Sequence, residues 1–413
     1  MEHLEVALSL ISQGVFSALL ASFGGALGYW MLEPAGLDGL AWPERARLTW
    51  PARIGSILLA FVLVVFCALI VPMLAGALRG PFQASVAVAF VAAVLPVRFL
   101  RRRFERRIHP RPEEADRPSG RLGFLLVMYG HLVGIFALVA AVSWLPLWAT
   151  PLGLVLAAGL VWGWSRGWGV ELALRAGLAS PAPPELDRRV RERAREQGIE
   201  LTSVDVLEYT AANAFALPLG RRVAFTRGAL EVLDDEGVMG IADHELGHVG
   251  EPRKVILARL AVTMALVPLV GLVPLVAHFG LMGLLVLLGV MVLWLSAGRR
   301  LRRRMEERAD AHAHEGDPRV YALALEALYR HNRAPAVLGR GPHPDLWDRM
   351  QAAGVEPSWG KPAAPTRWGY RLRVLGALLA TAGAVLVLRV GLAVPQIFWP
   401  ESWWMQVLWG GGF

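Results

Sequence analysis

The sequence predicts a mainly α-helical protein: a polytopic membrane helix bundle of about eight spans that carries a small α+β domain on its cytoplasmic face. Its composition, its apolar segments and the positions of its arginines each indicate this class. Of the 413 residues, 55% are hydrophobic and only 18% are charged, and the mean hydropathy is +0.45. Soluble domains carry about 25% charged residues, so the composition favours a membrane protein.

Eight segments are apolar and long enough to cross a bilayer, which takes about 20 residues of helix. They lie near 6–32, 54–78, 82–99, 122–147, 151–168, 255–275, 279–297 and 372–395. With the polar stretches between them, they predict five regions. These are an N-terminal membrane region of five spans (1–168), a cytoplasmic piece (169–254), a two-span hairpin (255–298), a second cytoplasmic piece (299–370), and a C-terminal span with a Trp-rich tail (371–413).

The arginines predict which side of the membrane each loop occupies, because cytoplasmic loops are enriched in basic residues. The loop after the third segment holds seven arginines within residues 98–111. With that loop inside, the Arg-rich stretches 33–53, 169–254 and 298–371 also fall inside, and the opposite loops share a single arginine, Arg79. We therefore expect an integral, multi-pass membrane protein with both polar pieces on the cytoplasmic side, in the plasma or inner membrane if the source is bacterial.

Two bulk properties exclude other classes of protein. The net charge is +8, but the arginines gather at the ends of apolar segments and form no stripe on a soluble face, so we expect no nucleic-acid partner. The single cysteine, Cys67, lies in an apolar run, which excludes both a disulfide framework and a cysteine-rich metal site. Any metal must therefore be held by histidines and carboxylates.

The first cytoplasmic piece ends in a helix that carries the sequence His-Glu-Leu-Gly-His, from His244 to His248. We expect this helix after a charged helix at 185–197 and strand-like runs at 203–209, 211–217 and 223–226. Residues four apart share a helix face, so His244 and His248 can hold one metal ion. Glu245 lies on the flank of that face, where it can take a proton from water, which is the arrangement of HExxH zinc hydrolases. An exposed helix with paired histidines is the alternative.

The second cytoplasmic piece supplies candidates for a third ligand, because catalytic zinc sites use three protein ligands and keep one position open. Glu306 and Asp310 lie four residues apart on the helix that follows the seventh segment, with the small Ala309 between them. Glu306 would bind the metal, and Asp310 would accept a hydrogen bond from a ligand histidine. Spacing alone leaves Glu307 as a competitor, and a salt-bridged surface helix as the alternative interpretation.

Four blocks in this order resemble the membrane gluzincins of peptidase family M48, which include the CAAX prenyl proteases and the HtpX-type heat-shock proteases. They are Asn213-Ala214-Phe215, Thr226–Leu230 leading into the His244–His248 motif, Arg303–Asp310, and His343-Pro344 with Arg349. The resemblance covers roughly residues 185–350. It completes the predicted fold class, in that the small α+β domain would be a gluzincin-type zinc protease domain.

The resemblance implies roles residue by residue. His244, His248 and Glu306 would bind one Zn²⁺ per chain, with Asp310 behind them and Glu245 as the general base. Asn213, Ala214 and Phe215 would bind the substrate as an added β-strand. His343 and Arg349 would stabilise the developing oxyanion or line the cleft. The expected activity is hydrolysis of peptide bonds in membrane or membrane-associated proteins, during quality control or processing.

Several features depart from the family or lie outside it. Asp243 stands where the family usually has a small residue, and would add negative charge beside the metal. His131, within the fourth segment, is either a functional intramembrane group or a histidine bonded to a neighbouring helix. His312 and His314 are expected at the surface. The rival functions are CAAX-type processing, a sensor protease that cleaves a specific regulator, and a non-enzymatic transporter or channel. The complete ligand set argues against the last, and the short outer loops argue against the sensor.

Overall fold

The structure is a computed structural model, and it describes residues 2–74, 82–108, 118–142, 145, 147–339, 344–366 and 368–398. His343 and the Trp-rich tail lie outside the described residues. The chain divides into two compact units: residues 1–111 with 364–413, and residues 112–363. This division groups the fourth and fifth apolar segments with both polar pieces. The five regions expected from the sequence stay predictions.

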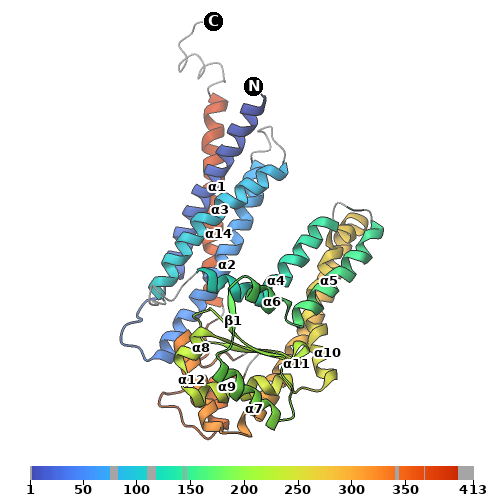
Figure 1. Ribbon diagram of the computed structural model, residues 1–413. Helices are drawn as coiled ribbons and strands as arrows, with labels where there is room; N and C mark the ends of the chain where they lie inside the picture. Colours follow the sequence, from blue (N-terminus) through green and yellow to red (C-terminus); the bar gives the residue numbers. More distant parts are fainter. Residues whose placement is uncertain are drawn as a thin grey trace. The chain divides into compact units, whose positions relative to one another are not determined.

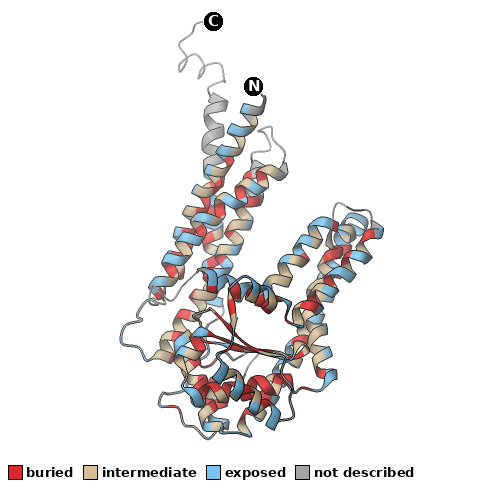
Figure 2. Ribbon diagram, in the orientation of Figure 1, coloured by how far each residue is buried: buried red, intermediate tan, exposed pale blue. Residues whose placement is uncertain are grey.

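The first unit is a bundle of four long helices. They are α1 (Glu2–Leu32), α2 (Trp42–Leu74), α3 (Phe82–Ile108) and α14 (Trp368–Phe398). Buried apolar side chains from all four form one core, and outward-facing apolar side chains are exposed (Figure 2). A Cβ at Gly24 would lie 2.6 Å from the hydroxyl oxygen of Thr381, and a Cβ at Gly28 would lie 2.4 Å from Leu59. These glycines therefore allow α1 to approach α14 and α2 closely.

The second unit combines apolar helices with a small sheet and the helices around it (Figure 1). Its helices are α4 (Pro118–Val142), η3 (Leu147–Ala149), α5 (Thr150–Ser165), α6 (Trp168–Arg175), α7 (Pro184–Glu196), η4 (Pro218–Gly220), α8 (Arg227–Val232), α9 (Asp235–Val249), α10 (Arg253–Thr263), η5 (Met264–Gly271), α11 (Leu272–His314), α12 (Pro318–Asn332) and α13 (Leu346–Ala352). Its strands are β1 (Ala179–Pro181), β2 (Ser203–Leu207), β3 (Ala214–Leu217) and β4 (Arg222–Thr226).

The sheet has the strand order β1-β2-β4-β3, so β3 is an edge strand. β2 and β4 are parallel, whereas β1 and β3 each run antiparallel to their neighbour. On one face, Leu207, Ala224 and Phe215 pack with α4 and α6, while α9 contacts β3 and β4. Three of the strands match the predicted runs, whereas β1 lies in a Pro-rich stretch outside them. The sheet thus lies between apolar helices and the helix that carries the His-Glu motif (Figure 1).

Two side-chain caps fix the helices next to the site. Asp234 accepts a hydrogen bond of 2.8 Å from the backbone N–H of Gly237 and begins α9. Thr226 is fully buried and begins α8 by accepting from the N–H of Ala229. The same hydroxyl accepts from the N–H of Asn213 at 2.8 Å. Thr226 therefore joins the start of α8 to the segment that leads into β3.

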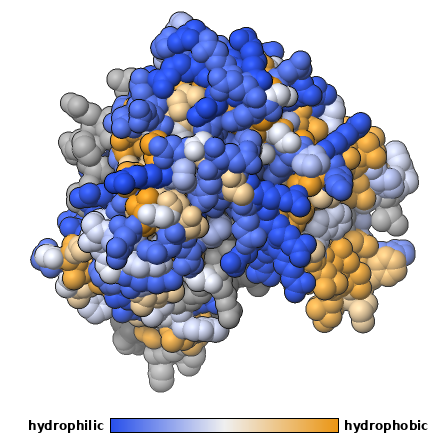
Figure 3. Space-filling model, turned by 90° about the horizontal axis from the view of Figure 1, so that it is seen from below, coloured by the Kyte–Doolittle hydropathy of each residue, from blue (hydrophilic) through white to orange (hydrophobic). Residues whose placement is uncertain are grey.

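Within the residues that the structure describes, six helical stretches are long and apolar enough to cross a membrane. They are Val6–Leu32, Trp42–Ala68, Ala84–Ile108, Ser119–Val142, Arg253–His314 and Trp368–Val387. Exposed apolar side chains line them and α5, with Val133 71% exposed and Leu293 74% exposed. The face of the molecule seen in Figure 3 is mostly hydrophilic, and hydrophobic side chains gather at its edge. The chain is therefore a mainly helical, integral membrane protein with a small sheet, as predicted at that level.

The fifth of these stretches, Arg253–His314, is a hairpin and not one straight helix. It comprises α10, η5 and α11, and the backbone leaves the helical region at Gly280 (φ 57°, ψ −141°). Trp294 donates a hydrogen bond of 2.9 Å to the carbonyl of Ala261, so the two arms lie side by side. The turn predicted near His278 is thus present. α5, at 16 residues, is about 24 Å long and shorter than the hydrocarbon core of about 30 Å.

Replacing Thr226 with valine should destabilise the second unit. The substitution keeps the shape of the side chain but leaves the N–H of Asn213 and the start of α8 without their acceptor. We expect a loss of about 1–3 kcal/mol, measured as a lower midpoint of thermal unfolding in detergent. Thr226→Ser keeps the hydroxyl and should lose less; equal losses for the two variants would contradict the role given to the hydroxyl.

Candidate metal centre

α9 presents the two histidines of the motif on one face, as their spacing predicts. His244 and His248 are 7% and 4% exposed, and their ring centroids are 5.0 Å apart. Gly247 lies between them in the sequence, and a Cβ there would lie 3.2 Å from the Cα of Ala309. α9 and α11 can therefore pack almost backbone to backbone at the level of the histidines.

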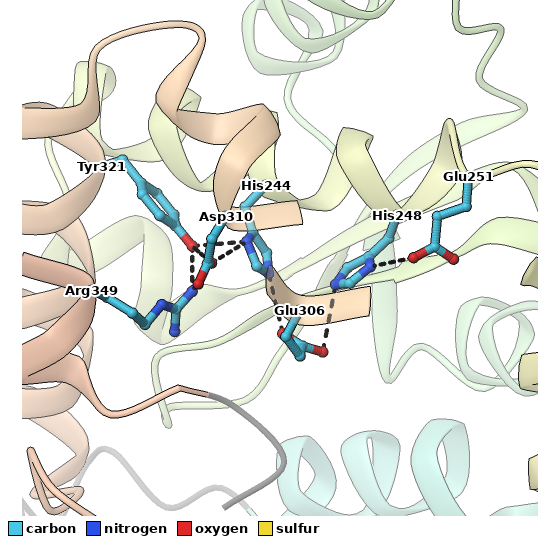
Figure 4. A network of polar contacts seen from close by, with 7 residues as sticks. All are labelled: His244, His248, Glu251, Glu306, Asp310, Tyr321 and Arg349. Atoms are coloured by element: carbon cyan, nitrogen blue, oxygen red, sulfur yellow. Dashed lines mark hydrogen bonds and ion pairs between the residues drawn. The ribbon is translucent and has the colours of Figure 1, made fainter. Parts of the chain in front are cut away.

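Glu306 reaches both histidines from α11 (Figure 4). One carboxylate oxygen lies 3.6 Å from Nε2 of His244, and the other lies 3.6 Å from Nε2 of His248. One ligand atom from each of the three residues falls within 4.8 Å of the others, so the group can hold a metal ion. Glu307 is half exposed and pairs with Arg303 at 3.1 Å. The geometry thus favours Glu306 over the competitor that spacing left open.

A buried polar network lies behind His244 (Figure 4). Nδ1 of His244 is 3.1 Å from Asp310 Oδ1 and 2.8 Å from the hydroxyl oxygen of Tyr321. Tyr321 donates to the same Asp310 oxygen at 2.6 Å. With Nδ1–H directed at Asp310, Nε2 of His244 keeps its lone pair facing Glu306. Asp310 therefore lies where the sequence placed it, whereas Tyr321, in the next helix, carried no sequence motif that we could identify.

Arg349 belongs to this network and lies on the Asp310 side of the ligands. Its Nη2 donates to Asp310 Oδ1 at 2.5 Å and also to the hydroxyl of Tyr321. Burial opposes the charge of this group, but its neighbours, Tyr321 and Asp310 first among them, raise the pKa of Arg349. Burial raises the pKa of Tyr321, because it disfavours the charged phenolate. At neutral pH the network thus holds a charged guanidinium against a carboxylate, with a neutral phenol between them.

Glu251 holds His248 from the opposite side to Asp310. Its Oε1 lies 3.3 Å from Nδ1 of His248, and its side chain is 3% exposed. The other oxygen, Oε2, is buried without a hydrogen-bond partner in the described structure. Glu251 was not among the predicted site residues. It lies just beyond the end of α9 at Val249, and its position three residues after a ligand histidine was a signal available in the sequence.

Two further acidic residues of α9 lie beside the ligands. Glu245 is 7% exposed and directly follows His244. Asp243 is 3% exposed, and its carboxylate binds Arg193 at 3.0 Å and Gln197 at 2.9 Å. Burial raises the pKa of Asp243, while Arg193 and Gln197 oppose that shift. The charge that we expected beside the metal is thus compensated by α7, and Asp243 anchors α7 to α9.

The segment expected to bind substrate precedes and forms the edge strand. Asn213 is exposed at the start of β3, Ala214 is buried and Phe215 is half-buried. The backbone carbonyl of Asn213 accepts from the N–H of Thr226 at 2.9 Å. In an antiparallel pair the bonded direction alternates, so the N–H and C=O groups of Ala214 and Ala216 point towards the open edge of β3.

Asn332 closes that edge at one end. Its side-chain amide donates to the carbonyl of Ala212 at 2.6 Å, and its side-chain oxygen accepts from the N–H of Ala212 at 3.1 Å. A single side chain thus makes the two bonds that a neighbouring strand would make there. The open part of the edge begins only after this point.

The other predicted histidines fall into three groups. His343 lies outside the described residues. His312 is half-buried and bonds Gln197, and His314 is half-buried with its ring 5.7 Å from that of Tyr321, so neither is the surface residue that we expected. His131 is half-buried, with its ring 6.5 Å from that of Trp164.

The donor set fits zinc. Two imidazoles and one carboxylate form a common zinc-hydrolase ligand set that leaves a position open for water. Each imidazole has its other nitrogen held by a carboxylate, which is the usual support of a ligand histidine. The class defined by this fold and site is therefore an integral membrane protein with a metallopeptidase-like centre.

Comparison with known proteins shows a similarity to one family within part of the chain. Residues 182–355 match the sequence model of peptidase family M48. Similar relatives include the Protease HtpX homologs of Methanothermobacter thermautotrophicus (32% identical over 105 residues, covering 24% of this chain and 39% of the relative) and of Aquifex aeolicus (38% over 85 residues, 20% and 28%). The Protease HtpX homolog of Thermoplasma acidophilum is 37% identical over 81 residues (18% and 26%).

The segment that matches peptidase family M48 contains the whole candidate centre. The matched stretches span less than two-fifths of the length of these relatives. The segment also includes α7 and the sheet strands that position α9, so the family match and the packing around the site define the same part of the chain.

Measuring the zinc content of two variants can show whether Glu306 or Glu307 is the third metal ligand. Glu306→Ala should lose bound zinc, because the third donor disappears, whereas Glu307→Ala should retain it, because that side chain pairs with Arg303 at the surface. Zinc per purified chain, measured by inductively coupled plasma mass spectrometry, tests both variants. Loss of zinc from Glu307→Ala alone would overturn the assignment.

Removing the charge behind His248 should weaken metal binding. Glu251→Gln leaves the side chain in place but gives a poorer acceptor for Nδ1–H, and we expect zinc affinity to fall by about 10–100-fold. Competition with a chromogenic chelator measures this affinity. Glu315→Gln is the matched control, since Glu315 stands three residues after His312, which is no ligand, and 3.6 Å from it. Equal affinities for Glu251→Gln and this control would contradict the role of Glu251.

Proposed function

We propose that this protein is a zinc-dependent endopeptidase of the membrane, which hydrolyses peptide bonds in membrane or membrane-associated proteins. The observation that carries the proposal is the convergence of His244, His248 and Glu306 within 4.8 Å, with Glu245 beside them. The match of residues 182–355 to peptidase family M48 supports it, as do the relatives whose names call them proteases.

In the proposed mechanism, bound zinc supplies Lewis acidity, which lowers the pKa of water to about 7 and polarises the scissile carbonyl. Glu245 takes a proton from the attacking water and passes it to the leaving amine. His244, His248 and Glu306 hold the ion. Asp310 and Glu251 keep the two imidazoles in the tautomer that leaves Nε2 free, while Tyr321 and Arg349 hold Asp310 in place.

We propose that the substrate binds as an extended strand along β3. The outward N–H and C=O groups of Ala214 and Ala216 would bond its backbone, and the exposed Asn213 would orient it at the start of the strand. The edge is already closed at Ala212 by Asn332, which sets where the added strand can begin.

We further propose eight membrane crossings with the catalytic centre on the cytoplasmic side. The hairpin of α10, η5 and α11 would cross twice around its turn at Gly280, and the short α5 would pair with α4 as a further crossing. The arginine distribution supports the orientation. A site tethered at the bilayer favours substrates that are themselves in or on the membrane, and quality control or processing of such proteins is the role we propose.

Glu245→Gln should keep the metal and lose the chemistry. The amide cannot accept the proton, and general acid–base catalysis contributes about 10²–10⁴-fold to rates, so cleavage of an unfolded membrane protein should fall by that factor while zinc stays at one per chain. Glu236→Gln, an exposed position on the same helix, should behave as wild type. Undiminished cleavage by Glu245→Gln would refute the mechanism.

A further inference from the structure

A cavity of about 210 Å³ lies beside the edge strand, within the second unit. It is lined by β3 and η4 on one side and by α4, α5 and α10 on the others. Most of the lining is apolar and includes Phe215 and Leu217. The volume is below the range of about 300–1,000 Å³ for small-molecule sites, and it suits a side chain or a chain end.

Two polar groups in this lining lack partners. Nη1 of Arg259, on α10, and Nδ1 of His131, on α4, are both buried and have no hydrogen-bond partner in the part of the chain that the structure describes. None of the described residues that line the cavity is acidic. A buried guanidinium N–H without an acceptor is unfavourable, so the cavity presents an unpaired donor of a positively charged group among apolar side chains.

The cavity lies on one face of the strand at which we propose substrate binding. The side chains of Phe215 and Leu217 point to this face, whereas Ala214 and Ala216 point to the other, the one nearer α9. A strand added to β3 alternates in the same way. Every second residue of the substrate would therefore be directed at the cavity.

We propose that this cavity is a substrate subsite that binds a carboxylate, with Arg259 as its partner and His131 as a second hydrogen-bonding group. The inference rests on the proposed peptidase function. The carboxylate can be an acidic side chain of the added strand or the free carboxyl end of the substrate. Arginine suits both, because its planar guanidinium forms two parallel bonds with a carboxylate. The apolar lining excludes water and strengthens that pairing.

The test compares peptides that differ only in charge. A fluorogenic peptide cleaved by the wild type is made with Glu or Gln at each position on either side of the scissile bond, and also as a free acid or a C-terminal amide. The ratio of kcat/KM for Glu over Gln is measured for the wild type, for Arg259→Met, which keeps the length of the side chain, and for Lys254→Met, an exposed position on the same helix.

The proposal expects a Glu preference of about tenfold or more in the wild type, at one position or at positions two apart. A preference for the free acid over the amide would instead identify the chain end as the carboxylate. Arg259→Met should bring the ratio close to one, and Lys254→Met should retain the wild-type ratio. Equal ratios in the wild type and Arg259→Met would overturn the proposal.

Measurements of peptide binding test the subsite independently of the proposed peptidase activity. Labelled Glu and Gln peptides can be titrated against Glu245→Gln, with and without the Arg259→Met change, and followed by fluorescence anisotropy. Tighter binding of the Glu peptide that disappears with Arg259→Met supports the subsite even if no cleavage is found in the wild type, a result that would refute only the peptidase function. Equal binding of both peptides would overturn the subsite while leaving the peptidase function standing.

Discussion

The candidate centre depends on how closely α9 packs against α11. Gly247 faces Ala309 with so little space that a Cβ on the glycine would lie 3.2 Å from the alanine backbone. On the same helix, a Cβ at Gly240 would lie 3.2 Å from the Cα of Tyr321 on α12. α9 thus approaches two helices through glycines. Glu306 and Asp310 project from α11, and Tyr321 projects from α12. These two contacts therefore set the position of the ligand Glu306 and of the two residues that hold the ligand His244.

The same packing makes the membrane hairpin part of the site. His248 and Glu306 are separated in the sequence by α10, η5 and the apolar part of α11, and the two arms of that hairpin lie side by side at Ala261 and Trp294. A Cβ at Gly298 would lie 2.5 Å from Val262, so the arms are also close near the point where the second arm leaves the apolar segment. The hairpin thus sets the position at which the Glu306 helix re-enters the polar domain.

Helical periodicity explains what the sequence could predict. Residues four apart share a face, so spacing alone was enough to place the pairs His244–His248 and Glu306–Asp310 on their helices. Neighbouring positions on a helix differ by about 100°, and the choice between Glu306 and Glu307 therefore required the orientation of α11 against α9. Tyr321 enters through a contact between helices, and no local pattern encodes such a contact. β1 spans three residues of a Pro-rich stretch, too short for a periodic signal.

Arg349 shows that a sequence motif can identify a residue of the site without giving its function. The sequence singled it out and gave it an oxyanion or cleft role, and the structure places its guanidinium against Asp310 and Tyr321, both buried. An arginine there compensates the carboxylate that holds His244, and removing one partner of such a pair leaves a buried charge. The Arg349 side chain is also only 5% exposed, so a substrate has little access to it. We therefore infer that Arg349 acts on the reaction through Asp310 and His244, and that the cation available to a substrate is Arg259.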